Sequence, residues 1–152
     1  MGLDMYFTAQ KKLWPMPKED CEDRKKCNSI RELFPEIKTD ESSNIEVAFD
    51  IGYWRKANHI HKWFVDNVQN GQDDQEKHYV DDDELKMLLI LCKKVLDNHD
   101  LAEKLLPTQG GFFFGCTEYS DYYFECIEST IKVVENALAL DGKYYLKYQA
   151  SW

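Results

Sequence analysis

One short stretch of the chain, residues 52–71 (GYWRKANHIHKWFVDNVQNG), gathers aromatic, cationic, amide and imidazole side chains. Such side chains recognise ligands, because aromatic rings stack on flat groups, cations neutralise anions, and amides and imidazoles form directed hydrogen bonds. A helix that only fills a core uses Leu, Ala and charged residues instead. We therefore predict a ligand-binding site formed by Tyr53, Trp54, Arg55, Lys56, Asn58 and His61.

This stretch must be held on an element that points its side chains in several directions. Placing residues 54–68 on a helix, at about 100° per residue, predicts three surfaces. The apolar surface holds Ala57, Ile60, His61, Phe64, Val65 and Val68; the opposite, charged surface holds Arg55, His59, Lys62 and Asp66; Lys56, Trp63 and Asn67 lie between them. We expect the charged surface to be solvated, although its cations could attract an anion.

Two polar residues near the apolar surface admit two interpretations. Asn58 and His61 are either buried groups that tie the helix to a neighbouring element, or groups that point into a cavity and bind a ligand there. A histidine in a cavity could also transfer protons, because its pKa is near neutrality. The sequence leaves both interpretations open.

Trp63 lies away from the apolar surface and needs its own explanation. It packs either beneath the segment 11–43 or within an interface with another protein. In the second case Trp63 would be the centre of an exposed, partner-binding aromatic patch.

A second aromatic group occupies residues 110–124 (GGFFFGCTEYSDYYF). Glycines allow close backbone approach there, and Thr117 and Ser120 place hydroxyls beside a predicted helix N-terminus, where anions are favoured. Together with Tyr119 and the cations Arg55 and Lys56, these residues could form a nucleotide-sized site. Thr117 and Tyr119 therefore complete the predicted ligand-binding set, although a Phe-rich core segment beside an ordinary helix cap explains part of the pattern.

Signals for catalysis or a metal are weak. His59 and His61 are two residues apart, so on a helix they point in nearly opposite directions and cannot share a metal ion. No phosphate-binding loop, dinucleotide-binding turn or nucleophile elbow occurs in the sequence. A solvated acidic turn explains Asp73 and Asp74, and a helix cap explains the acidic residues 81–83. We expect no cofactor, no metal and no enzymatic activity.

The composition of the chain restricts the remaining classes of function. The 152 residues carry a formal net charge of −9, which opposes general affinity for nucleic acids or anionic membranes. The five cysteines form no CxxC pair, so reduced thiols are the simplest interpretation. The first residues lack the apolar segment of a secretion signal, and no apolar run approaches the length of a membrane span. These features predict a soluble cytoplasmic protein, and they leave open whether it forms a homo-oligomer.

The pattern along the chain predicts one α+β domain over residues 1–152. Alternating apolar residues predict strands near 3–7, 45–51 and 144–150, with a short strand at 78–80. Helical periodicity follows at 82–96, 101–106 and 121–138, and residues 11–43 read as a loop-rich insertion with one short helix near 29–34. We expect a mainly antiparallel sheet with helices on one face and the two terminal strands as neighbours.

Several segments resemble a family of small uncharacterised proteins from bacteriophages and prophages. They are the run at 52–71, the opening MGLDMY, LLPTQGGFFFG followed by TEYSDYYF, and the terminal SW. The resemblance implies expression in a bacterial cytoplasm and an accessory or counter-defence role. We therefore expect a non-catalytic protein that binds a small anionic, nucleotide-like ligand. The alternative is an inhibitor that binds a host protein through the Trp63 patch, and an enzyme using His61 with a carboxylate is the least supported.

Overall fold

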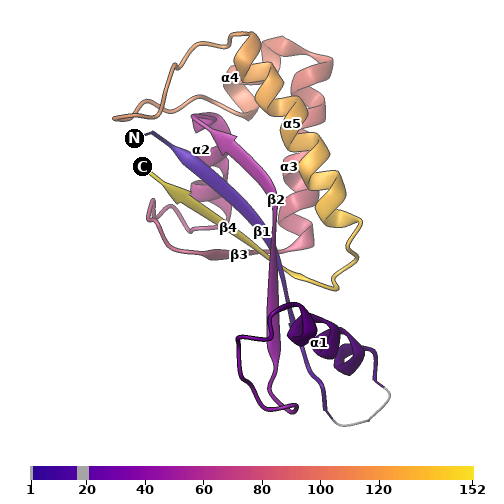
Figure 1. Cartoon of the computed structure of the whole chain (residues 1–152). Coiled ribbons are helices and arrows are strands. Elements are labelled where there is room, and N and C mark those ends of the chain that lie inside the picture. Colours follow the sequence, from indigo (N-terminus) through magenta and orange to yellow (C-terminus); the bar gives the residue numbers. More distant parts are fainter. Residues whose placement is uncertain (1, 17–20) are drawn as a thin grey trace. The chain divides into compact units, whose positions relative to one another are not determined.

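The computed structural model describes residues 2–16 and 21–152. It contains a four-stranded antiparallel sheet in the order β2-β1-β4-β3, formed by β1 (Asp4–Leu13), β2 (Ile45–Arg55), β3 (His78–Val80) and β4 (Tyr145–Ser151) (Figure 1). The chain divides into two compact units, residues 1–9 with 50–152, and residues 10–49. The predicted α+β fold with neighbouring terminal strands is confirmed.

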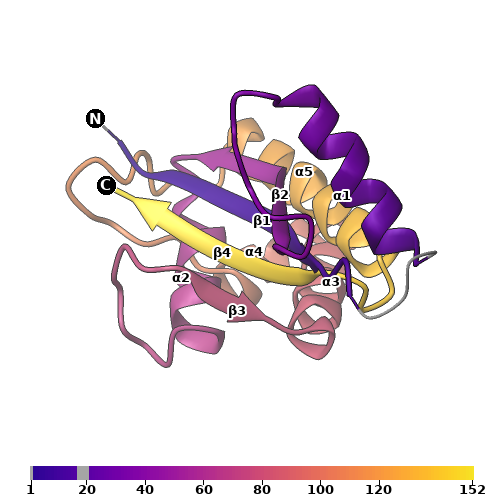
Figure 2. The ribbon, with the colours of Figure 1, turned by 60° about the horizontal axis from the view of Figure 1, so that its bottom comes forward.

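The helices of the larger unit cover one face of its sheet. They are α2 (Asn58–Asn67), α3 (Asp82–Asp97), the 3₁₀ turn η1 (His99–Leu101), α4 (Ala102–Leu105) and α5 (Asp121–Leu138). In Figure 2 the strands lie in front and α2, α3 and α5 lie behind them. Alternate strand residues therefore point into this core, including Met5 and Phe7 of β1 and Leu146 and Tyr148 of β4.

The sequence signals for these helices are local and strong. Asp81 caps α3 and forms a capping box with Glu84, whose side chain accepts from the Asp81 backbone N–H. The α3 residues that point to the core recur at helical spacing and are Leu85, Leu88, Cys92 and Val95. No helix in the described part of the chain combines the length and apolar character needed to cross a membrane.

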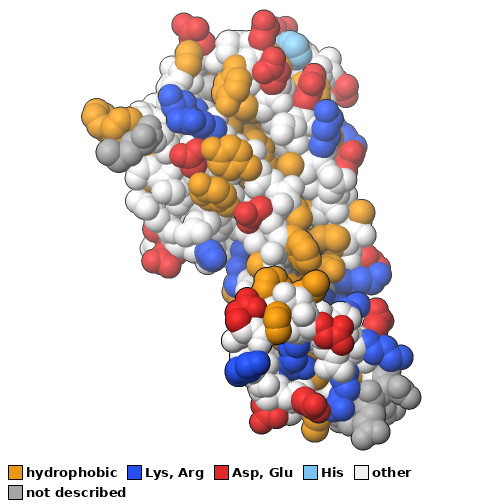
Figure 3. All heavy atoms as spheres, in the orientation of Figure 1, with side chains coloured by type: hydrophobic (Ala, Val, Ile, Leu, Met, Phe, Trp, Pro, Cys, Tyr) orange, Lys and Arg blue, Asp and Glu red, His pale blue; other side chains and the backbone are white. Residues whose placement is uncertain are grey.

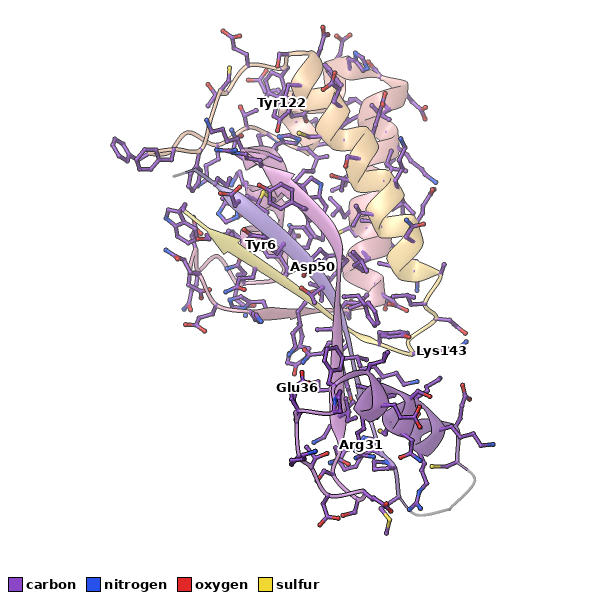
Figure 4. The ribbon with its side chains drawn as sticks, in the orientation of Figure 1. Tyr6, Arg31, Glu36, Asp50, Tyr122 and Lys143 are labelled. Carbon is purple, nitrogen blue, oxygen red and sulfur yellow. The ribbon has the colours of Figure 1, made fainter. Side chains whose placement is uncertain are left out.

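The smaller unit, residues 10–49, contains a longer helix than the sequence predicted. Helix α1 (Glu22–Leu33) begins within the charge cluster that we read as loop, because the Cys21 sulfur caps it by accepting from the Arg24 N–H. The guanidinium of Arg31, labelled in Figure 4, donates to the Ser43 carbonyl at 2.7 Å and to the Asp40 carbonyl at 3.1 Å. These bonds order a segment that has few buried apolar residues. Residues 17–20 of the predicted insertion lie outside the described residues.

The boundary between β2 and α2 differs from the prediction. Residues 54 and 55 belong to the strand, and the helix begins only at Asn58. Lys56 has a left-handed backbone (φ 56°), which no strand or helix continues through. Gly52 lies within β2 beneath α5, and a Cβ there would come 2.6 Å from Cγ1 of Val133. The strand therefore needs glycine at this position for the helix to pack closely.

Candidate functional site

A cavity of about 250 Å³ lies at the N-terminus of α5, and we call it the α5 cavity. The end of β2, the start of α2 and the loop between α4 and α5 form its walls. Its lining residues are Lys56, His59, Thr108, Gly115, Cys116, Glu118, Ser120, Tyr122 and Tyr123. The cavity therefore joins the two sequence segments in which we predicted a site.

The electrostatics of the α5 cavity favour one anionic group. Ser120 is the N-cap of an 18-residue helix but makes no side-chain capping bond, so backbone N–H groups of the first turn keep their capacity to donate. The helix dipole adds a partial positive charge at the same end. Lys56 contributes a full positive charge, whereas Glu118 contributes a negative one. This balance suits a small anion better than a polyanion.

The position of Lys56 depends on two unusual backbone conformations. The left-handed Lys56 donates its N–H to the Leu3 carbonyl at 2.7 Å, which fixes the turn after β2. Gly115 has φ +89°, and a Cβ there would lie 2.9 Å from the Lys56 Cβ. Only glycine lets the loop approach this closely without displacing the lysine.

His59 lines the α5 cavity from the first turn of α2, although we expected it on the solvated, charged surface. That expectation is wrong, because His59 is 3% exposed and its ring lies 4.1 Å from the Tyr123 ring of α5. A helical wheel finds the apolar surface of α2 but does not reveal that α5 covers the other side. Burial lowers the pKa of His59 to about 3, so the imidazole is neutral at pH 7. Its Nε2 has no hydrogen-bond partner among the residues that the structure describes.

A second hollow of about 260 Å³, the β2 hollow, lies beside the α5 cavity. It is lined by Tyr53, Trp54, Arg55, Tyr122, Glu125, Cys126 and Ser129. Tyr122, labelled in Figure 4, lines both hollows, and its hydroxyl donates to the Arg55 carbonyl at 2.5 Å. Three predicted site residues thus lie in the β2 hollow, and a fourth, Lys56, lies in the α5 cavity.

Within the β2 hollow, Tyr53 and Arg55 share an acidic neighbour. The Tyr53 hydroxyl donates to Oδ1 of Asp4 at 2.5 Å, and this bond raises the pKa of Tyr53 above its ordinary value. The Arg55 Nε lies 3.9 Å from the same oxygen. Tyr6 and Tyr53 lie with ring centroids 5.5 Å apart, and both are exposed. Figure 3 shows hydrophobic side chains gathered on this face with Lys or Arg side chains beside them.

Trp54 is not available to a ligand in the way that Tyr53 is. It is 3% exposed, and its indole N–H donates to Oγ1 of Thr130 at 2.9 Å. As part of β2 it points inward, whereas its neighbours Tyr53 and Arg55 point outward, because side chains alternate along a strand.

The Asn58 side chain holds the wall of the α5 cavity in place and is not one of the residues that line the cavity. Its amide nitrogen donates to the Phe114 carbonyl at 3.1 Å and the Cys116 carbonyl at 2.9 Å, and its oxygen accepts from the Gln109 N–H at 3.0 Å. The side chain thus ties α2 to the loop 109–116. Of the two interpretations that the sequence left open, this is the one in which Asn58 is a buried group that ties the helix to a neighbouring element.

His61 is likewise occupied by protein partners. Its Nδ1 lies 2.8 Å from the Tyr148 hydroxyl, and its Nε2 lies 3.0 Å from Oδ1 of Asp73. Burial lowers the pKa of His61, against the opposing effect of Asp73. His61 is fully buried, so it links α2 to β4 and to the 72–76 segment.

The remaining predicted residues lie near the α5 cavity but do not line it. The Thr117 carbonyl accepts from the Thr108 hydroxyl at 2.9 Å, and the Tyr119 ring meets the Tyr123 ring edge-on at 5.0 Å. Trp63 is only 5% exposed, so the expected exposed patch centred on it is wrong. The expected charged surface of α2 is covered only in part, because the side chains of Lys62 and Asp66 are still 33% and 50% exposed.

The sequence also missed residues that line the α5 cavity. Glu118 and Cys116 carried no signal of their own, because a single acid or thiol in a loop has no periodicity. Among the residues that the structure describes, no cluster of three or more His, Cys, Asp or Glu side chains could hold a metal ion.

Comparison with known proteins adds no assignment. A scan against protein-family models, a search of curated proteins and a search of solved structures each found no match. The geometry of the site therefore carries the functional argument.

Proposed function

We propose that this protein binds a small anionic, nucleotide-like ligand without chemically changing it. The uncapped N-terminus of α5 carries the proposal, because Ser120 at that terminus and Lys56 line the same cavity. An anionic group in that position accepts hydrogen bonds from backbone N–H groups and is attracted by the helix dipole and by Lys56. The dipole contributes about 0.3–1 kcal/mol at an exposed site, so Lys56 and the N–H groups supply the rest.

The flat part of such a ligand would extend from the α5 cavity into the β2 hollow. The α5 cavity, at about 250 Å³, is smaller than the roughly 300–1,000 Å³ of pockets for drug-sized ligands. Tyr122 lies between the two hollows, and Tyr53 lies beyond it beside Arg55. Both phenol rings could stack on a base, an interaction worth about 1–3 kcal/mol per base.

A binding role fits the histidines better than a catalytic one. His61 has both ring nitrogens occupied by Tyr148 and Asp73. With a pKa of about 3, His59 is a weak base and is not protonated at pH 7, whereas acid–base catalysis works best with a pKa near the working pH. Neither ring is therefore suited to proton transfer at neutral pH.

The resemblance to phage and prophage proteins suggests a cellular context for this binding. In a bacterial cytoplasm, a protein of this kind would sequester a nucleotide signal used in host defence. This is the counter-defence part of the proposal. It rests on the sequence resemblance alone.

Isothermal titration with inorganic phosphate, nucleoside monophosphates and cyclic oligonucleotides tests the proposal. We expect at least one nucleotide to bind, with about tenfold weaker affinity for Lys56→Met, a loss of about 1.4 kcal/mol. Lys93→Met is the matched control, because Lys93 pairs with Glu135 on the surface away from the cavity. The proposal fails if no member of the panel binds, or if folded Lys56→Met binds as tightly as the wild type.

Native mass spectrometry of protein isolated from phage-infected bacteria is the complementary test. A small molecule that stays with the folded protein and is released on denaturation would identify the ligand. The alternative function, inhibition of a host protein through an exposed patch centred on Trp63, lacks its surface, because Trp63 is only 5% exposed.

A further inference from the structure

The β2 hollow carries two opposite charges that come from different elements. Arg55 is the last residue of β2, and Glu125 lies in the second turn of α5. A site that only collects anions gains nothing from Glu125, because its carboxylate repels a phosphate. A carboxylate accepts hydrogen bonds and cannot donate them. This end of the site therefore suits a ligand group that offers N–H donors to Glu125 and acceptors to Arg55.

The guanidinium of Arg55 is accessible to such a ligand. Its side chain is 59% exposed, and its Nε lies 3.9 Å from Oδ1 of Asp4, which is too far for a hydrogen bond. The Tyr122 hydroxyl bonds to the backbone carbonyl of Arg55 and not to its side chain. The planar fork of N–H groups can therefore donate to two neighbouring acceptors on one edge of a ligand.

Glu125 lies on the same side of α5 as Tyr122. The two residues are three positions apart, which makes them neighbours on the helix surface, and both line the β2 hollow. Glu125 is exposed, so its two carboxylate oxygens can be reached from solvent. They can accept two parallel N–H groups from one ligand edge.

The two tyrosines of the hollow are held in place by their own hydrogen bonds. The Tyr122 hydroxyl donates to the Arg55 carbonyl, and the Tyr53 hydroxyl donates to Asp4. Tyr122 and Tyr53 are nevertheless 51% and 52% exposed, so their rings remain available for stacking. Side chains that are already ordered lose less conformational entropy when a ligand binds.

Guanine matches this set of groups better than adenine does. Guanine presents the N1–H and N2 amine donors on one edge and the O6 and N7 acceptors on another. A carboxylate accepts from the first edge, and a guanidinium donates to the second. Adenine has an acceptor at N1 and a donor at N6, so it would oppose an acceptor to Glu125 and a donor to Arg55. Hypoxanthine keeps N1–H, O6 and N7 but lacks the N2 amine.

We propose that the ligand is a guanine nucleotide and that Glu125 and Arg55 select its base. The inference rests on the proposed function, since it keeps the phosphate in the α5 cavity, near Lys56 and the start of α5. Tyr122 lines both hollows, so the base stacks there and extends into the β2 hollow. Glu125 accepts from the N1–H and N2 amine, and Arg55 donates to O6 and N7.

Isothermal titration with matched nucleotides tests the selection of the base. The ligands are the 5′-monophosphates of guanosine, inosine and adenosine, together with cyclic di-GMP and cyclic di-AMP. We expect each guanine ligand to bind at least about tenfold more tightly than its adenine counterpart, with the inosine nucleotide between the two monophosphates. Equal affinities within each guanine–adenine pair would overturn the inference and leave the proposed function standing. If none of the nucleotides binds, the proposed function fails and the inference fails with it.

Two substitutions assign the preference to residues. Glu125→Gln should weaken guanine binding about tenfold without weakening adenine binding, because one amide N–H would oppose a guanine N–H. Arg55→Met should also lower the ratio of guanine to adenine affinity. Glu128→Gln is the matched control, because it makes the same charge change at an exposed α5 position outside the hollow. A guanine preference that survives in Glu125→Gln would exclude Glu125 as the selecting residue.

Discussion

The Nδ1 atom of His61 lies 2.8 Å from the hydroxyl oxygen of Tyr148, deep in the core of the larger unit. Both residues are completely buried. Because Asp73 lies 3.0 Å from the other ring nitrogen, the neutral imidazole can donate from Nε2 to Asp73 and accept at Nδ1 from Tyr148. This chain of bonds connects α2 to the C-terminal strand. It explains why a histidine occupies an apolar helix surface.

Removal of the Tyr148 hydroxyl should therefore destabilise the fold. We expect Tyr148→Phe to lower the free energy of unfolding by about 1–3 kcal/mol, because His61 Nδ1 loses its partner where water does not reach it. Urea denaturation measures the change. Tyr145→Phe, on the exposed side of the same strand, should change stability by less than about 0.5 kcal/mol. Equal effects of the two substitutions would contradict this account of the network.

Gly52 should be intolerant of even one added methyl group. We expect Gly52→Ala to cost about 1–3 kcal/mol, because its Cβ would come 2.6 Å from Val133. Val133→Ala removes the opposing methyl groups, so the double variant should lose less than the sum of the single losses. Gly110→Ala is the control, since its Cβ would meet no atom closer than 3.9 Å. Additive losses at positions 52 and 133 would exclude this contact as the cause.

Stability should fall on acidification partly because of His59. Its folded pKa of about 3 lies below the ordinary 6.5, so between these values the unfolded chain binds a proton that the folded chain does not. Stability from this group is complete above about pH 6.5 and is lost as pH falls toward 3. From pH 7 to pH 5 the loss is about 2 kcal/mol. In His59→Phe the difference in unfolding free energy between these pH values should shrink by that amount, and an unchanged difference would argue against a neutral, buried imidazole.

Cys116 should be the most reactive thiol of the larger unit. It is exposed and lines the α5 cavity, whereas Cys92 and Cys126 are buried. Burial also raises the pKa of Cys92 to about 12, which removes its thiolate at neutral pH. We expect brief alkylation to modify Cys116 before Cys92 and Cys126, as read by peptide mass spectrometry. A ligand in the α5 cavity should slow this reaction, and labelling of Cys92 first would contradict the burial pattern.

Asn58 should control the order of the cavity wall. We expect Asn58→Ala to speed amide hydrogen exchange in the loop 109–116, because three hydrogen bonds between its side chain and that loop are lost. The Gln109 amide should show the largest effect, since Asn58 is its acceptor. Asn67→Ala, at the other end of α2, is the control because its amide donates to the Trp63 carbonyl within the same helix. Unchanged exchange at 109–116 would show that other contacts hold the loop.

The sequence determined those features that depend on local periodicity. Alternation in 3–7 and 144–150 predicted β1 and β4, and the Asp81–Glu84 capping box fixed the start of α3. The apolar surface of α2 was also predictable, because Ile60, Phe64 and Val65 recur at helical spacing and are buried. α1 was underestimated, since it is capped by a cysteine, an uncommon capping residue, and has little apolar periodicity.

The tertiary structure decided which groups surround each side chain, and therefore which residues form the candidate site. Periodicity along one element says which residues share a surface, but not which surface another element covers. α5 therefore buried His59, which the sequence placed in solvent, and the packing around α2 closed over Trp63. A single left-handed residue, Lys56, follows the end of β2 and lines the α5 cavity, whereas Tyr53 and Arg55 line the β2 hollow. The residue types in the site were thus visible in the sequence, but their division between wall, cavity and core arose from long-range packing.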